Sequence, residues 1–468
     1  MHFWPTGKNP AAPGAFDDGL FFYYAYDHEA SYRAFERATA YEPGRAMAYW
    51  GMALASGPDL NTPMTAAQFG KGAAAIAKAQ TLDAGVTPEE HRFISAMSRR
   101  YKGTFAQWNG DDAAYRAAMS QFARDSANET AKMLAAEALL EAGGLDWQSG
   151  SLANPDSRQA FALVNDVLRT NASNLMANHL CIHLYDFAPE RGAALPCAQR
   201  LDATKFPPEA EHLAHMPAHY WIETGNYRAA QASSERAVAL SNELQASRSA
   251  PQYASRYHKH DVAVGYAAAM MLGSYADARR WADRMAGAFD TSFYALTALR
   301  FGRYADAYRA ADAGFAAQTI KGWAALRLGR VQEAQSMGHA LPKDIVEKNY
   351  LAQLFLAALA EANGDLPSAR SWVARARTAQ HADFRGELLP AIPAGEALGA
   401  LELRHGNAQG AIDAFSQTLH DYPNDPRALF GLSAAYQAAD RASEAAATRA
   451  QFARQWKGAD TIAPDALL

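Results

Sequence analysis

A turn-and-helix phrase recurs along this chain and constrains its fold more than any other feature. Each copy opens with glycine, places an aromatic or aliphatic residue two positions later, and continues into an alanine-rich segment. The copies begin at Gly225, Gly273, Gly302, Gly329, Gly364 and Gly406. Glycine can end a helix in the left-handed conformation, and alanine lets helices approach closely. The repetition predicts an all-α fold, a right-handed superhelix (α-solenoid) of antiparallel helix pairs.

The phrase is most regular in residues 225–455, and an earlier copy spans 26–55. Residues 57–158 are less regular, and a histidine-rich segment occupies 178–261. No compositional linker separates these regions, and no sustained alternation of β-branched and polar residues predicts strands. We therefore expect one continuous superhelix over residues 1–468.

The composition excludes several classes of partner. The chain has 468 residues, of which 49% are hydrophobic and 20% charged, and its net charge is −5. Nucleic acid and anionic membranes are therefore not expected partners. No apolar run reaches the roughly 18 residues that a membrane span needs. A small molecule or a peptide is the expected substrate.

Seven of the 14 histidines lie between residues 179 and 260. His179 and His183 are four residues apart, and His212, His215 and His219 follow at offsets that keep side chains on one helix face. Pro217 interrupts the segment 208–224, which otherwise reads as helical, and such a break beside histidines is typical of a functional site. Neutral imidazole is the commonest metal ligand among side chains. The predicted ligands are His179, His183, His212, His215, His219 and His260.

An all-histidine donor set narrows the choice of metal. Structural zinc prefers sites that contain cysteine, and calcium and magnesium prefer oxygen donors. Imidazole suits copper, zinc, iron and nickel. Copper is the first prediction, with zinc or iron as alternatives. The six histidines could form two three-histidine centres, which would look like a coupled dicopper site. The alternative is a single ion with an open coordination position.

Other side chains could assist chemistry at such a site. His28 stands at a repeat position that is usually apolar, and Tyr257 adjoins His258. Among the nearby carboxylates, Glu211 is the predicted general base, and a carboxylate could instead orient a ligand histidine. The other carboxylates are Asp186, Glu223 and Asp261. The aromatic residues close in sequence include Tyr23, Tyr24 and Tyr26, most of them expected in the repeat core. The predicted catalytic residues are His28, Tyr257 and Glu211.

The two cysteines, Cys181 and Cys197, fit no thiolate zinc pattern. A disulfide between adjacent antiparallel helices would imply an oxidising compartment, and two buried thiols are the alternative. The first residues lack the apolar core of a signal peptide. The expected location is the cytoplasm, or the periplasm or exterior if a signal peptide has been removed.

Four motifs carry a resemblance to a known group. They occupy Phe16–Phe35, Ala46–Pro58, Asn178–His183 (N-H-x-x-I-H) and His212–His219 (H-L-x-H-M-P-x-H). The chain resembles, over nearly its whole length, a group of bacterial tetratricopeptide-repeat (TPR) proteins. The resemblance implies the TPR superhelix and a retained histidine at His260. Ala263 stands where the group has a further histidine, so no ligand is expected there, and the resemblance implies no reaction.

Three functions follow as hypotheses. The first is a copper-dependent oxidoreductase, either an oxidase or an oxygenase, with its site on the inner face of a TPR superhelix. The second is a zinc-dependent hydrolase or lyase. The third is a non-enzymatic scaffold that binds a peptide or protein. Concentrated histidine favours an enzyme, because peptide-binding grooves of this kind usually carry lysine, arginine and asparagine.

Overall fold

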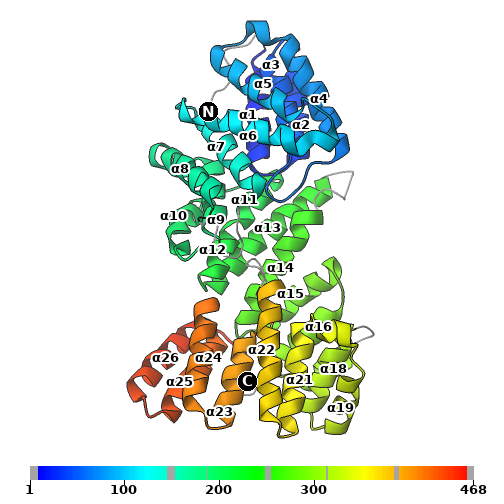
Figure 1. Cartoon of the computed structure of the whole chain (residues 1–468), viewed down its shortest axis with the longest axis vertical. Coiled ribbons are helices and arrows are strands. Elements are labelled where there is room, and N and C mark those ends of the chain that lie inside the picture. The colour runs from blue at the N-terminus through cyan, green and yellow to red at the C-terminus, as the bar shows by residue number, and fades with distance from the viewer. Residues whose placement is uncertain are drawn as a thin grey trace. The chain divides into compact units, whose positions relative to one another are not determined.

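The computed structural model describes residues 9–144, 152, 154–186, 188–247, 255–311, 315–383 and 389–460. Within these ranges the chain is almost entirely helical, and its only β-type pairing is an isolated bridge between Asp59 and Thr62. Successive helices pack as antiparallel pairs, as in α1 with α2, α21 with α22, and α23 with α24 (Figure 1). The all-α fold of stacked helix pairs is therefore confirmed.

Contacts along the chain divide it into two compact units. Among the described residues, the first unit runs to Pro217 and includes 239–247, and the second contains Ala218–Val238 and 255–460. The single continuous superhelix stays a prediction. The helices of the first unit are α1 (Ala11–Tyr24), α2 (His28–Tyr41), α3 (Ala46–Ala55), α4 (Ala66–Thr81), α5 (Pro88–Arg100), α6 (Trp108–Arg124), α7 (Glu129–Leu139), α8 (Pro155–Thr170), α9 (Leu175–Tyr185), α10 (Leu195–Asp202) and α11 (Glu211–His215).

Regular helix pairs make up most of the second unit. Its helices are α12 (Pro217–Glu223), the first part of α13 (Tyr227–Ser247), α14 (Ser255–Met271), α15 (Tyr275–Ala288), α16 (Ser292–Arg300), α17 (Tyr304–Ala310), α18 (Phe315–Arg327), α19 (Val331–His339), α20 (Lys343–Val346), α21 (Tyr350–Ala362), α22 (Leu366–Asp383), α23 (Ala394–Arg404), α24 (Ala408–Asp421), α25 (Pro426–Ala438) and α26 (Ala442–Gln455). In the part of the chain that the structure describes, no helix is long and apolar enough to cross a membrane.

The glycines of the recurring phrase end helices as predicted, with one exception. Positive φ angles of 69–79° occur at Gly225, Gly302, Gly329, Gly364 and Gly406. In each case the next residue donates its N–H to the carbonyl five positions earlier, which closes a Schellman motif. The prediction is wrong at Gly273, which has no positive φ. A Cβ there would lie 2.7 Å from the Trp456 ring, so close packing is what requires glycine at this position.

One packing device recurs in both units. Phe35 of α2 fits against Gly19 of α1 and Gly51 of α3, where added Cβ atoms would come within 2.7 and 2.3 Å of its ring. Phe415 of α24 fits in the same way against Gly399 of α23 and Gly431 of α25. A large ring on the second helix of a pair therefore fills the hollow that glycine leaves on two flanking helices, and the core is built from repeats of this contact.

The second unit closes on itself. Tyr227, at the start of α13, donates its hydroxyl to the carbonyl of Pro423, 196 residues later. The Arg427 guanidinium of α25 donates to the carbonyls of Met270 and Met271 at the end of α14, at 3.1 and 3.2 Å. These contacts join the first helices of the unit to its last pairs, so the intervening pairs, α15 to α24, lie between two ends that touch.

Candidate metal centre

Three buried histidines of the first unit converge on one point. His179 and His183 are one turn apart on α9, which is capped by Asn174, whose side chain accepts from the N–H of Ala177. Every residue from Met176 to Leu184 is buried, so both imidazoles face protein rather than water. His212 reaches the same point from α11. The side chains of His179, His183 and His212 are at most 2% exposed.

The Nε2 atoms of the three imidazole rings lie close together. The Nε2 atom of His179 lies 3.1 Å from the Nε2 of His183 and 3.1 Å from the Nε2 of His212. One ligand nitrogen from each of the three residues falls within a span of 4.8 Å. An imidazole nitrogen holds one lone pair or one hydrogen, so a single Nε2 makes only one well-directed N–H···N bond. A metal ion between the three rings can instead be coordinated by the Nε2 lone pair of each histidine at the same time.

The spacing fits coordination by one ion. Imidazole nitrogens bind zinc and similar ions at about 2.0–2.1 Å, and tetrahedral angles then separate neighbouring nitrogens by roughly 3.3 Å. The two separations of 3.1 Å are close to this value. The donor set of His179, His183 and His212 therefore fits a first-row transition metal with one further position open.

A carboxylate holds one of these ligands from behind. Asp186, just after α9, places its Oδ2 3.3 Å from Nδ1 of His183, and both side chains are 2% exposed. A carboxylate on Nδ1 favours the tautomer whose Nε2 lone pair points into the site. Cys181 lies between the two histidines of α9 and forms a disulfide with Cys197 of α10, which ties the ligand helix to its neighbour.

Tyr26 covers the site in an unusual backbone conformation. Its φ is 60°, and Asp27 donates to the carbonyl of Phe22, so Tyr26 occupies the turn position that glycine takes elsewhere. A bulky residue in this region costs about 1–3 kcal/mol. Its ring stacks on His212 at 5.2 Å between centroids and meets His179 edge-on at 4.6 Å. The contact with two candidate ligands gives a reason for tyrosine at a glycine position.

A second buried polar group lies beside Tyr26. The hydroxyl of Tyr23 donates to Glu137 of α7 at 2.6 Å, and Tyr26 lies near enough to that carboxylate to lower its pKa slightly. Burial raises the pKa of Glu137 to about 7, with a smaller upward contribution from the charge of Asp59. His28 stacks on Tyr23 at 5.0 Å, and its Nε2 lies 3.8 Å from Asp59. Burial lowers the pKa of His28, although Asp59 opposes the shift.

The remaining predicted residues divide between the two units. His28 lies beside Tyr26, with 6.2 Å between their ring centroids. Glu211 is buried and accepts from the N–H of His212. His215 is buried at the end of α11, and the predicted break follows it, because α12 begins at Pro217.

The second unit contains a histidine pair of its own. His219 of α12 and His260 of α14 stack with 5.4 Å between centroids, and their Nε2 atoms are 3.5 Å apart. Tyr257 is half-buried on α14, three residues before His260 and so on the same face.

The sequence predicted His179, His183 and His212 as ligands, and the structure brings these three together, but it assigned no role to Tyr26 or Glu137. The signal for Tyr26 was its place in a turn, Y-D-H after an apolar helix, where the recurring phrase has glycine. The signal for Glu137 was a single carboxylate inside an alanine- and leucine-rich helix, where burial is the rule.

No family model and no curated protein matches the chain. Solved structures match over most of their length at low similarity. The Cut9–Hcn1 hetero-tetramer of the APC/C is 12% identical over 99% of this chain and 96% of that chain, with a TM-score of 0.31. Yeast Tom70 is 13% identical over 96% and 92%, with a TM-score of 0.29. The human IFIT1 dimer with m7Gppp-AAAA is 11% identical over 96% and 91%, with a TM-score of 0.34. The fold assignment therefore rests on the helix pairs described above.

Proposed function

We propose that His179, His183 and His212 hold a copper ion and that the protein is a metal-dependent oxidoreductase acting on a small organic or peptide substrate. The observation that carries the proposal is the convergence of three Nε2 atoms, with His179 3.1 Å from each of the other two. Burying three imidazoles together is costly unless their ring nitrogens are satisfied, and one divalent ion satisfies all three.

The donor chemistry favours copper over the alternatives. The chain has two cysteines, and they are joined to each other, so no thiolate is available for a zinc–cysteine or iron–sulfur site. Among divalent ions, imidazole sites bind copper most tightly. Copper supplies one-electron redox chemistry when bound, whereas zinc would supply only Lewis-acid chemistry. Zinc or iron, with a hydrolase or lyase activity for zinc, is the alternative.

Tyr26 supports a redox role. Its ring packs on two of the three ligands, and Tyr26 lies near enough to the Glu137 carboxylate to influence its pKa, which burial raises to about 7. The phenol therefore stands between the metal ligands and a group that can accept a proton at physiological pH. A structural zinc site needs no such arrangement.

The disulfide indicates the kind of compartment in which the protein works. The pair Cys181–Cys197 joins two neighbouring helices of the first unit, and disulfides persist in oxidising compartments. We infer that the protein works in the periplasm or outside the cell. We also propose that the chain belongs to the bacterial TPR group defined by the N-H-x-x-I-H and H-L-x-H-M-P-x-H motifs.

Metal content tests the proposal directly. The protein is prepared without metal, offered copper and zinc together, dialysed, and analysed for both elements. We expect one tightly held copper in the first unit, lost in His179→Ala and His212→Ala and retained in His91→Ala. His91 is the matched control, because its side chain is 60% exposed and pairs with Asp83.

Two results would contradict different parts of the proposal. Equal metal content in His179→Ala and the parent protein would remove the three-histidine site. Selective binding of zinc would leave the site and remove the oxidoreductase. Reversible reduction of the bound copper by ascorbate and reoxidation by air, followed by electron paramagnetic resonance, is the expected redox signature.

A further inference from the structure

A cluster of buried carboxyl groups in the first unit shares a single arginine. Arg100 of α5 is 1% exposed and donates to Asp112 of α6 at 2.7 Å and to Glu141 at 2.8 Å. Glu137 lies four residues before Glu141, is also 1% exposed, and accepts from the hydroxyl of Tyr23. In this Arg100 cluster, three carboxyl groups therefore stand against one guanidinium, and the partner of Glu137 is a neutral phenol.

The backbone of α7 changes where the two glutamates lie. The α-helix ends at Leu139, and the chain continues as a π-helical turn, Leu140–Gly144, which carries Glu141. Turns of this wider kind are frequent at functional sites. One oxygen of each carboxylate, Oε1 of Glu137 and Oε1 of Glu141, is buried and has no hydrogen-bond partner. An ionised carboxylate in such a place is costly, and a bound proton removes the charge that makes it so.

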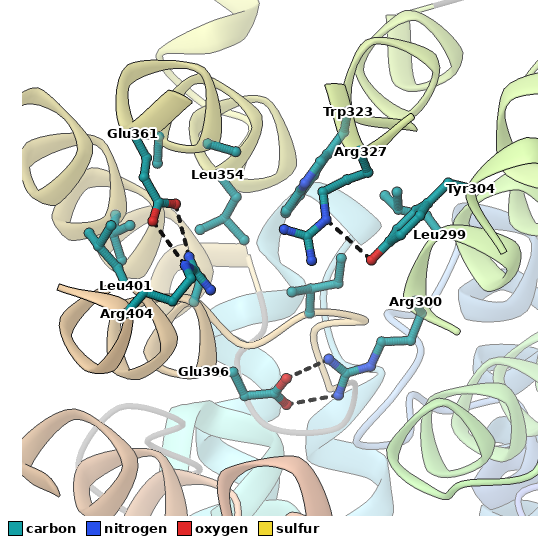
Figure 2. Close-up of a pocket in the computed structure, with 15 residues that line it drawn as sticks. Leu299, Arg300, Tyr304, Trp323, Arg327, Leu354, Glu361, Glu396, Leu401 and Arg404 are labelled. Atoms are coloured by element: carbon teal, nitrogen blue, oxygen red, sulfur yellow. Dashed lines mark hydrogen bonds and ion pairs between the residues drawn. The ribbon is translucent and has the colours of Figure 1, made fainter. Parts of the chain in front are cut away.

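Buried carboxylates of the second unit are balanced in a different way. Arg300 makes two hydrogen bonds to Glu396, at 2.5 and 2.8 Å, and both side chains are 2% exposed. Arg404 makes two hydrogen bonds to Glu361, each of 2.9 Å. Figure 2 shows both forked contacts, with one guanidinium for each carboxylate. In the Arg100 cluster one guanidinium serves three carboxyl groups, so charge balance there requires a bound proton.

Burial favours that proton on the two glutamates. It raises the pKa of Glu137 to about 7. It also raises the pKa of Glu141, with Arg100 opposing the shift and the charge of Glu137 adding to it. Carboxyl groups coupled in this way titrate as a pair, so the proton belongs to both. The titratable and charged groups that act on the pair are Tyr23 of α1, Tyr26, Asp59, Arg100 of α5, and Asp112 and Tyr115 of α6. Of the other helices packed on α7, α8 carries Asp166, paired with Lys132 of α7, and α9 carries His179 and His183.

Tyr26 connects the pair to the histidines. Its ring contacts His179 and His212, and Tyr26 lies near enough to Glu137 to lower the pKa of that carboxyl group. In addition, α9, the helix of His179 and His183, packs on α7. In a protein, a unit charge about 10 Å away shifts a pKa by roughly one unit. A divalent ion on the histidines would therefore weaken the hold of the pair on its proton.

We propose that Glu137 and Glu141 are a proton-loading pair for the three-histidine site, holding a proton while the site is without metal and releasing it when a divalent ion binds. The inference rests on the proposed binding of metal by His179, His183 and His212. Once ionised, the pair can take up the proton that a substrate loses when it gives an electron to the ion.

Zinc is the probe for the test, because it has no redox chemistry and reports on the proton alone. Calorimetric titration of the full chain in buffers of different ionisation enthalpy counts the protons released per zinc bound. The histidines contribute to this count in every variant. At pH 6 the parent protein should release about half a proton more than Glu137→Gln, in which the amide still accepts from Tyr23. The excess should fall several-fold by pH 8, where a group with a pKa of about 7 has lost most of its proton.

A carboxylate on the surface of the same unit supplies the matched control. Glu89 lies in the exposed first turn of α5, the helix of Arg100, and accepts from the hydroxyl of Ser126. Glu89→Gln should release as many protons as the parent protein. Glu141→Gln should release fewer, as Glu137→Gln does, because the two glutamates share the proton.

Two results would overturn the proposal and leave the three-histidine site standing. The first is equal proton release at pH 6 by the parent protein, Glu137→Gln and Glu141→Gln. The second is an excess that stays constant from pH 6 to pH 8, which would assign the extra proton to another group. A different result, zinc binding that is absent or that survives in His179→Ala, would remove the three-histidine site itself and with it the role of the pair.

Discussion

The two units bury polar side chains in opposite ways. In the second unit, the buried Arg300 and Glu396 carry opposite charges and satisfy each other through two hydrogen bonds. In the first unit, His179, His183 and His212 are the same group, and their ring nitrogens face one another. Opposite charges satisfy each other without a third partner, whereas three imidazole nitrogens that face one another can share a cation. Under the proposed function, the ion pair stabilises the fold and the histidine cluster binds a metal ion.

The same contrast exists in the turns. Five helix-pair turns of the second unit have glycine in the left-handed conformation, the residue that adopts it at no steric cost, and the last pair has the small polar Asp440 there. The first pair of the first unit has Tyr26 there, in contact with two candidate ligands. Local strain is thus found next to the histidine cluster, where a function can account for it.

Breaking the buried ion pair should have the largest effect on stability. Arg300→Met leaves the Glu396 carboxylate buried near Asp425, and the loss of one partner from such a pair costs about 3–5 kcal/mol. Chemical denaturation measures the change. Arg404→Met, which removes the more exposed partner of Glu361, should cost at most about 1 kcal/mol. Metal content should be unchanged in both, and a loss of metal in Arg300→Met would contradict the separation of the two clusters.

Removing the disulfide tests the first unit. The double variant Cys181→Ser, Cys197→Ser opens a loop with a sequence separation of 16 residues. Loop-closure entropy for that length is about 3 kcal/mol, so the free energy of unfolding should fall by about that amount. Denaturation of the parent protein with and without reductant should give the same difference. An unchanged stability would mean that the cysteines are not paired in the folded protein.

The helix-pair repeats and the convergence of candidate histidines could be predicted from the sequence for physical reasons. Glycine after an apolar helix has few alternatives to the left-handed cap, and histidines at offsets of three and four share a helix face. The pairing of ligands was not readable, because it depends on which helices become neighbours. His212 joins His179 and His183, while His219 lies against His260; the sequence predicted all of them as ligands without assigning them to centres. The left-handed conformation of Tyr26 could not be predicted either, because only its tertiary contacts explain it.

Asp186→Asn tests whether the carboxylate that contacts His183 contributes to metal affinity. Asparagine keeps the shape but loses the charge that fixes the His183 tautomer, so metal affinity should fall by about 10–100-fold while stability without metal changes little. Competition with a chelator of known affinity measures this. Glu223→Gln, in the second unit, is the control and should bind metal as the parent protein does. Equal affinity in Asp186→Asn would mean that the carboxylate does not act through the ligand.

The last comparison concerns the pH dependence of stability. The groups facing Glu137 are Tyr23, Tyr26, Asp59 and Arg100, and burial is the main reason why the pKa of Glu137 rises to about 7. Because this folded-state pKa lies above the unfolded value near 4.5, the folded protein binds more protons between the two values. The Glu137 contribution to stability is therefore present at low pH and lost as pH rises towards about 7. Glu137→Gln cannot titrate, so its stability should fall less steeply with pH, by up to about 1.4 kcal/mol per pH unit.

Denaturation of the metal-free parent protein and of Glu137→Gln at a series of pH values measures the two slopes. Removing metal keeps proton release by the histidines out of the comparison, and the ligands titrate alike in both proteins. Parallel curves from pH 4.5 to 7 would show that Glu137 is ionised in the folded protein throughout this range. With an unraised pKa it would be only a weak proton acceptor for Tyr26 at neutral pH, and the redox role proposed for that tyrosine would lose its support, while the three-histidine site would stand.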